Sequence, residues 1–228
     1  MMDNPTSKTL IPKYMKTLRK TIINWYQENG RIYPWRQTQN PFQILIAEMM
    51  LRRTKADQVL PVYIQFLKTY PDIDSLSKAK QESLEKILYP LGLKWRISAF
   101  KEAAQKIKEK YNSRIPEIRE ELKSLPGVGE YVAGAVLAIA FNKEEWLVDS
   151  NIVRVFKRYF GIETSKEGRR DKHIIEISKI FAMGKDPSKA TLGILDISSL
   201  LCKPIKPICE RCPLKKRCHY RLSKLSNK

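Results

Sequence analysis

Apolar residues recur with helical spacing along almost the whole of this chain. Between Ile97 and Tyr111 they are three and four residues apart, which places them on one face of an α-helix. Comparable patterns occupy residues 10–26, 42–51, 59–70, 82–89 and 171–183. No alternating apolar and polar run is long enough to predict a sheet. The sequence therefore predicts an all-α fold, with turns marked by Pro and Gly and a basic tail at residues 222–228.

The charge balance points to a polyanionic partner. The chain has 43 Lys and Arg residues against 24 Asp and Glu, a net charge of +19 among 228 residues. Solubility does not require such an excess, and nucleic acid is the commonest partner of proteins that carry one, although a generally basic protein is the alternative. No apolar run approaches the roughly 20 residues of a membrane span. Residues 1–13 also lack the apolar core of a signal peptide. We expect an intracellular monomer of the cytoplasm or nucleoid, with no membrane partner.

A Gly-containing turn joins two predicted helices, residues 117–124 and 130–141. The second helix is apolar on all sides and should be buried. Between them lies Leu125-Pro126-Gly127-Val128-Gly129. Gly127 and Gly129 permit a tight turn with positive φ, and the helix N-terminus that follows favours an anion. Gly127, Val128 and Gly129 are therefore candidate phosphate-binding residues, although an ordinary helix–helix turn would look the same.

All four cysteines lie within residues 202–218, and six, two and five residues separate them. Cys202, Cys209, Cys212 and Cys218 could bind a [4Fe–4S] cluster or a tetrahedral zinc ion. Zinc sites usually pair two C-x2-C units, and only one is present here. In an intracellular protein this density indicates a metal site, not disulfides.

Two carboxylates stand out by their context. Asp149 follows an apolar stretch and precedes Ser150-Asn151, which could cap a helix from Ile152 to Phe160, although Asp149 could itself be only a helix cap. Glu48 lies inside the apolar helix 42–51. A buried Glu needs either a chemical task or a salt-bridge partner.

The hairpin stretch 125–129, then Asp149, then the four cysteines resemble in their order the helix-hairpin-helix DNA glycosylases of the endonuclease III and adenine glycosylase superfamily. The resemblance extends from Trp25 to Cys218. It implies two helical lobes with a cleft, and double-stranded DNA with a mismatched or damaged base as partner. A six-helix lobe would span residues 34–143. Residues 1–33 and 144–228 would form the other lobe, with a [4Fe–4S] cluster on the loop 202–218.

The same resemblance implies roles for three side chains. Asp149, where the chain crosses between the lobes, would stabilise the cationic sugar formed as the glycosidic bond breaks. Bifunctional members carry a Schiff-base Lys at the position of Tyr131, so a monofunctional enzyme is implied, with Tyr131 lining the base pocket or packing as a core aromatic. Glu48 matches the residue with which adenine glycosylases protonate the leaving purine.

The pair Arg52-Arg53 bears on the substrate. Many adenine glycosylases have Gln-Gln here, whereas thymine–DNA mismatch glycosylases of the superfamily have two Arg. Arg53 would fill the gap left by the flipped base and donate to O6 and N7 of the orphaned guanine. The alternative is that both Arg lie on a solvated helix end.

The expected function is therefore removal of thymine or uracil mispaired with guanine. Adenine excision opposite guanine or 8-oxoguanine is the alternative, favoured by Glu48 and by the segment 33–36. Against it, the sequence ends soon after Cys218, where full-length adenine glycosylases continue into a further domain. A non-catalytic DNA-binding module is a third possibility, and the carboxylates argue against it.

Overall fold

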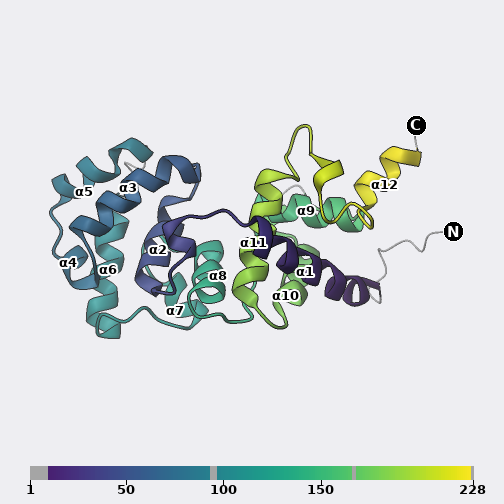
Figure 1. Cartoon of the computed structure of the whole chain (residues 1–228). Coiled ribbons are helices and arrows are strands. Elements are labelled where there is room, and N and C mark those ends of the chain that lie inside the picture. Colours follow the sequence, from purple (N-terminus) through teal and green to yellow (C-terminus); the bar gives the residue numbers. More distant parts are fainter. Residues whose placement is uncertain (1–9, 93–96, 166–167, 227–228) are drawn as a thin grey trace. The chain divides into compact units, whose positions relative to one another are not determined.

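The computed structural model describes residues 10–92, 97–165 and 168–226, and these form helices joined by turns and irregular segments, with no strand among them (Figure 1). The predicted all-α fold is confirmed. The chain divides into two compact units, Ile32–Phe141 and the discontinuous pair Met1–Arg31 with Asn142–Lys228. No helix within the described ranges combines the length and apolar character of a membrane span.

The continuous unit contains seven α-helices in its described residues, one more than predicted. They are α2 (Pro41–Met50), α3 (Ala56–Thr69), α4 (Ile73–Ser77), α5 (Gln81–Leu88), α6 (Ile97–Tyr111), α7 (Arg119–Lys123) and α8 (Glu130–Ile139). Short 3-10 turns cover Pro34–Arg36 and Tyr89–Leu91. The additional helix is α4, which is too short to show a period in sequence. A reciprocal capping box stabilises its start, because Asp72 accepts from the Ser75 amide at 2.8 Å and Ser75 bonds back to Asp72.

Helix α8 is the buried centre of this unit. Residues 132–139 are all buried, as the apolar pattern predicted, and α2 packs against this helix. Ala and Gly make up much of α8, so that its backbone can approach its neighbours closely. Farther along the unit, the rings of Phe66 and Phe100 join α3 to α6, with centroids 5.7 Å apart.

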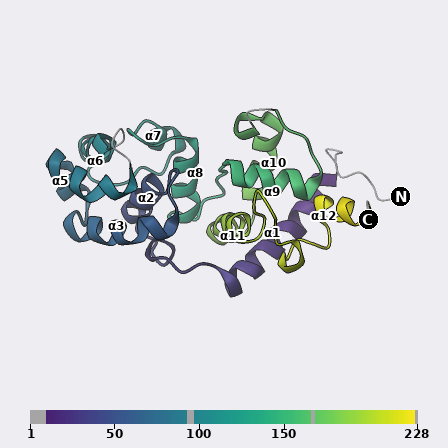
Figure 2. The same cartoon turned by 90° about the horizontal axis from the view of Figure 1, so that it is seen from above.

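The discontinuous unit consists of α1 (Leu10–Asn29), α9 (Ser150–Phe160), α10 (Lys172–Ala182), α11 (Pro187–Leu200) and α12 (His219–Ser226), with short 3-10 turns at Gly168–Arg170 and Cys209–Arg211. The sequence patterns did not predict α11, which lies beside α1 (Figure 2). Close approach requires Gly193, because a Cβ there would lie 2.7 Å from Cγ2 of Ile22. The predicted basic tail is wrong for residues 222–226, because they continue α12 against α9. Residues 227–228 lie outside the described part.

The chain passes between the units twice, after Arg31 and before Asn142, and helix α11 binds both of these residues. Arg31 donates to Asp196 from its backbone amide at 2.9 Å and from Nε at 2.7 Å, and Asp196 is fully buried. At the second connection, the amide of Ser188 donates to Oδ1 of Asn142 at 3.2 Å. Within this unit, the residues at both connections are thus hydrogen-bonded to one helix.

Candidate active site and cysteine loop

The turn between α7 and α8 uses its two glycines differently. Gly127 has φ +77°, and a Cβ there would meet Cε of Met49 at 2.9 Å and Cβ of Ala99 at 3.1 Å. Gly129 has φ −107° and ψ −175°, an extended conformation, and a Cβ there would meet nothing within 4 Å among the described residues other than its chain neighbours. The expected positive φ is therefore right for Gly127 and wrong for Gly129. Of the two glycines in this turn, the fold itself requires only Gly127.

The amide groups of this turn define what an anion could reach. Val128 is buried, and its amide donates to the carbonyl of Leu125 at 3.1 Å, so it serves the turn itself. Gly129 is the N-cap of α8 and supplies no side-chain cap. Within the described part of the chain, the amides of Gly127 and Gly129 donate to no protein acceptor. An anion at the start of α8 would therefore meet these two amides and the positive end of the helix dipole.

Glu130 places a carboxylate at this same helix start, and two cations neutralise it. Lys123 approaches Glu130 to 2.5 Å, and Arg119 to 3.1 Å. Burial on its own would raise the pKa of Glu130. The hydrogen bonds from Lys123 and Arg119 outweigh that effect and hold its pKa below the usual 4.5.

Glu48 and Tyr131 lie on helices that pack against each other. Glu48 belongs to α2 and is only 4 % exposed, in keeping with its apolar sequence context. Tyr131 is the second residue of α8 and is half-buried. The continuous unit therefore carries both residues.

Arg52 and Arg53 follow directly on the end of α2. Nη1 of Arg52 donates to the carbonyl of Gly127 at 2.8 Å. Arg53 has φ +63°, and its side chain is exposed. A non-glycine residue rarely adopts this left-handed conformation, so the surrounding turn must stabilise it.

Asp149, in the discontinuous unit, is the N-cap of α9. Its Oδ1 accepts from the amides of Asn151 at 2.9 Å and Ile152 at 2.7 Å, and its Oδ2 accepts from Nδ2 of Asn151 at 2.7 Å. The expectation that Ser150-Asn151 caps a helix beginning at Ile152 is wrong, because α9 begins at Ser150 and Asp149 caps it. Three donors fix the orientation of a half-buried carboxylate.

Arg154 connects this carboxylate to the cysteine loop, and sequence reasoning missed it. Its Nη1 donates to Oδ1 of Asn151 at 3.0 Å, its Nε to the carbonyl of Cys202 at 2.7 Å, and its Nη2 to the carbonyl of Ser198 at 2.8 Å. The three-residue spacing from Asn151 to Arg154 on one helix face could have indicated the first contact. The other two depend on tertiary structure.

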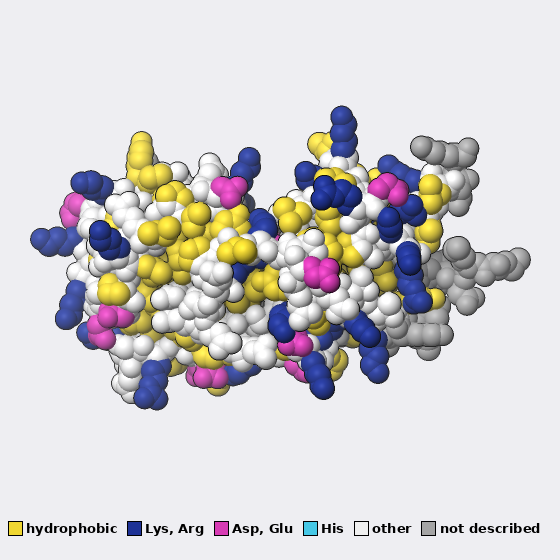
Figure 3. All heavy atoms as spheres, in the orientation of Figure 1, with side chains coloured by type: hydrophobic (Ala, Val, Ile, Leu, Met, Phe, Trp, Pro, Cys, Tyr) yellow, Lys and Arg dark blue, Asp and Glu magenta, His cyan; other side chains and the backbone are white. Residues whose placement is uncertain are grey.

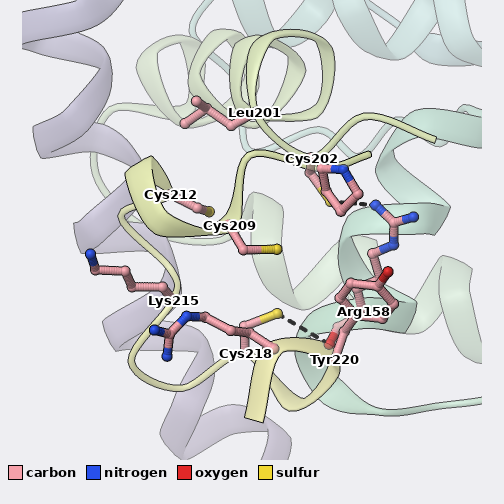
Figure 4. Close-up of a pocket in the computed structure, with 10 residues that line it drawn as sticks. Arg158, Leu201, Cys202, Cys209, Cys212, Lys215, Cys218 and Tyr220 are labelled. Carbon is pink, nitrogen blue, oxygen red and sulfur yellow. Dashed lines mark hydrogen bonds between the residues drawn. The ribbon is translucent and has the colours of Figure 1, made fainter. Parts of the chain in front are cut away.

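The four cysteines line one pocket of the loop (Figure 4). Arg158 of α9, also missed in the sequence, lines it too. Arg158 donates to the sulfur of Cys202 at 3.5 Å and to the carbonyls of Lys203 and Pro204 at 2.7 and 2.9 Å. Its own carbonyl accepts from the thiol of Cys218 at 3.4 Å. Arg158 thus joins the first and last cysteines of the motif.

Burial raises the pKa of the Cys212 thiol to about 12 and also raises the pKa of Cys218, and the other cysteines add to both shifts. Thiolates crowded in such a place need a cation to offset their charge. In the described residues, no group of three or more His, Cys, Asp or Glu side chains converges as the ligands of one ion would.

Comparison with known proteins identifies the family. Residues 46–179 match the model of the HhH-GPD superfamily base excision DNA repair proteins. A thymine-DNA glycosylase of Aeropyrum pernix is 36 % identical over 90 % of this chain and 95 % of its own length. A thymine/uracil-DNA glycosylase of Methanothermobacter thermautotrophicus is 34 % identical over 96 % and 97 % of the two chains.

The chain is also similar to a solved structure and to adenine DNA glycosylases. The solved structure of a thermostable thymine-DNA glycosylase aligns with a TM-score of 0.86 and 34 % identity, covering 92 % of this chain and 98 % of that one. An adenine DNA glycosylase of Buchnera aphidicola is 35 % identical over 92 % of this chain and 59 % of its own length. The resemblance inferred from the hairpin, Asp149 and the cysteines is confirmed, and the chain belongs to the HhH-GPD superfamily of base excision DNA repair proteins.

Proposed function

We propose that this protein is a monofunctional DNA glycosylase that removes thymine or uracil mispaired with guanine. The observation that carries the proposal is its similarity, over at least nine tenths of the chain, to proteins named thymine-DNA and thymine/uracil-DNA glycosylases. The reaction is hydrolysis of the N-glycosidic bond. Water adds to C1′ of the sugar, and the bonding electrons leave with the base, which then takes up a proton. The products are a free base and an abasic site.

Asp149 is the proposed catalytic carboxylate. As the base departs, the sugar becomes an oxocarbenium-like cation, and a fixed carboxylate stabilises that charge and can accept a proton from the attacking water. The three donors on Asp149 keep it in one orientation. Such preorganisation is what electrostatic catalysis needs, because no reorientation is then required during the reaction.

Glu48 and Tyr131 are the proposed base-pocket residues. With a proton on its carboxyl group, the buried Glu48 can donate a hydrogen bond to the extruded base as negative charge builds on it. Tyr131 offers a ring for stacking and a phenol in place of an amine nucleophile. Arg53, exposed on its turn, would enter the space vacated in the duplex and donate to the orphaned guanine.

Double-stranded DNA is the proposed partner. The chain carries 43 Lys and Arg residues against 24 Asp and Glu, and many of the Lys and Arg side chains visible in Figure 3 project at the edges of the view. Phosphates would meet this charge and the amides of Gly127 and Gly129 at the start of α8, with Val128 holding the turn. The observed similarity to DNA glycosylases gives this partner independent support. We propose that the protein acts as a monomer.

The decisive experiment compares single-turnover base release by the parent and by Asp149→Asn on a T·G duplex. Asn caps a helix as well as Asp does, so this variant should remain folded and lose only the charge. We expect release to fall on the order of 100-fold or more. Asp171 is a matched control, because it caps α10 through the amides of His173 and Ile174. Asp171→Asn should release base at the parent rate. Equal loss in both variants, or none in either, would contradict the proposed role of Asp149.

Adenine excision is the second candidate, because the buried Glu48 and the similarity to adenine DNA glycosylases both favour it. The two functions differ in the base released. We expect faster release of thymine from T·G and of uracil from U·G than of adenine from A·G or A·8-oxoguanine in the same flanking sequence. Faster adenine release would establish the second candidate.

We further propose that Cys202, Cys209, Cys212 and Cys218 hold a [4Fe–4S] cluster. The donor set fits, because four thiols line one pocket, with Arg158 beside the first of them. When bound, the cluster would fix the loop 202–218, whose basic residues include Lys203, Lys206 and Arg211. The protein should be brown as purified and contain about four iron atoms per chain. Colourless protein with one zinc ion per chain would contradict the assignment.

A further inference from the structure

Two adjacent arginines after α2 have different surroundings. The side chain of Arg52 turns back to the α7–α8 hairpin and donates from Nη1 to the carbonyl of Gly127 at 2.8 Å. The side chain of Arg53 is exposed. A guanidinium bound to a backbone carbonyl has fewer donors left for DNA, whereas an exposed one keeps them available.

Gly127 is held by α2 through a second contact. Its Cα lies so close to Met49 that a Cβ would approach Cε of that residue to 2.9 Å. Met49 and Arg52 therefore hold one residue of the hairpin from the same end of α2, by packing and by a hydrogen bond. The positive φ of Gly127 sets the direction of the carbonyl that Arg52 reaches.

Arg53 needs a fixed environment because its backbone conformation is unfavourable. Its φ is +63°, and this region costs a non-glycine residue roughly 1–3 kcal/mol. The amide of Thr54 donates to the carbonyl of Leu51 at 3.3 Å, a long hydrogen bond that closes the turn weakly. The contact from Arg52 to Gly127 ties this turn to the rest of the unit.

We propose that Arg52 is a positioning residue: by holding Gly127 it fixes the turn of Arg53 relative to the phosphate-binding amides of the hairpin. The inference rests on the proposed function, in which Arg53 fills the space left by the flipped base. Because Arg52 donates to the carbonyl of Gly127, the distance between Arg53 and the amides of the hairpin is set before DNA binds. Binding then does not have to order the turn, and the base is extruded by a preorganised surface.

A direct phosphate contact by Arg52 is the competing interpretation, and the two predict different behaviour. Loss of a phosphate contact weakens binding to every sequence and lowers the salt slope of log Kd by about 0.9. Loss of a positioning contact leaves the salt slope unchanged and slows the step that extrudes the base. If Arg52 positions Arg53, the effect of replacing Arg52 depends on whether Arg53 is present. If Arg52 contacts a phosphate directly, its replacement has the same effect with or without Arg53.

The experiment uses the full chain and a T·G duplex with 2-aminopurine next to the thymine, so that fluorescence reports extrusion and chemical quench reports base release. Four variants are compared with the parent at saturating enzyme: Arg52→Met, Arg52→Lys, Arg53→Gly and the double variant Arg52→Met/Arg53→Gly. Arg52→Met keeps the stem and removes the donors, whereas Arg52→Lys keeps the charge and a donor. Arg53→Gly keeps the left-handed turn without its strain. Arg114→Met, an exposed arginine of the same unit, controls for loss of one charge.

We expect Arg52→Met to slow extrusion and base release about tenfold, as loss of one charge-assisted hydrogen bond would. Its salt slope should equal that of Arg114→Met. Arg52→Lys should recover part of the rate, and its recovery keeps the test valid if the Met variant unfolds. In the Arg53→Gly background, Arg52→Met should have little further effect.

Additive effects of Arg52→Met and Arg53→Gly on the rate of base release would overturn the proposal. It would also be overturned if Arg52→Met released base at the parent rate and had a lower salt slope than Arg114→Met. A failure of the proposed function looks different, because the parent itself would then release neither thymine nor uracil.

Discussion

Asn151 donates from Nδ2 to Oδ2 of Asp149 at 2.7 Å, and thereby extends the helix cap of α9 to the second carboxylate oxygen. The same amide accepts from Arg154 through its Oδ1, and Arg154 holds the carbonyl of Cys202. Two side chains thus link the proposed catalytic carboxylate to the first cysteine of the loop. The position of Asp149 therefore depends on Asn151 and Arg154, which belong to none of the sequence motifs identified above.

Asn151→Ala should slow thymine release about tenfold while the protein stays folded, because one donor to the carboxylate is lost and the two backbone donors remain. Single-turnover rates on T·G duplexes measure this.

Arg154→Met should slow thymine release as well and also hasten loss of iron from the proposed cluster to a chelator, because it releases the carbonyls of Cys202 and Ser198. A chelation rate equal to that of the parent would show that Arg154 does not support the loop.

Gly129→Ala should bind a T·G duplex at least several-fold more weakly with unchanged thermal stability. Apart from its two chain neighbours, nothing in the described part of the protein lies within 4 Å of the added methyl group, so a ligand at the start of α8 would meet it. Gly127→Ala is the contrasting variant. It should lose stability by roughly 1–3 kcal/mol or more, because φ is +77° and Met49 is in the way. Unfolding curves and DNA titrations on both variants separate these effects, and normal binding by Gly129→Ala would argue against the phosphate site.

Glu130 should make the stability of the hairpin dependent on pH in the acid range. Its folded pKa lies below 4.5, so its contribution is present above the unfolded pKa and disappears as pH falls through the folded value. Glu130→Gln should therefore melt slightly below the parent at pH 6, and the two proteins should converge as the pH falls below the folded pKa of Glu130. The carboxylate is half-exposed, so the difference should be small. Melting temperatures across this pH range provide the measurement, and a gap that widens on acidification would contradict the assignment.

The parent should form no covalent adduct with DNA. Tyr131 has no amine to attack C1′, so product strands should stay intact until alkali cleaves the abasic site. Borohydride trapping measures this directly. Tyr131→Lys places an amine at the start of α8 and should yield a trapped adduct, whereas Gln65→Lys, an added lysine at an exposed position of α3 outside the hairpin, should not. An adduct with the parent would mean that another lysine acts as the nucleophile.

Local patterns determined much of this protein. Helical periodicity predicted the all-α fold, because each helix needs one apolar face. Apolar and small residues on all sides predicted the burial of α8. The stretch 125–129, Asp149 and the four cysteines indicated the family because each motif is short and continuous, so that its chemistry is encoded by neighbouring residues.

Tertiary structure decided the rest. Helix α11 lacks a clear apolar stripe because it is buried on most sides against α1 and α9, so periodicity could not identify it. Residues 222–226 are too few to show a helical period in the sequence, and they are helical in the structure, where α12 packs against α9. Gly127 and Gly129 look equivalent in the sequence, but in the structure the positive φ of Gly127 and its packing against Met49 and Ala99 distinguish them. The contacts of Arg52 with Gly127 and of Arg154 with Cys202 join residues far apart in the chain, and no local pattern encodes a partner at such a distance.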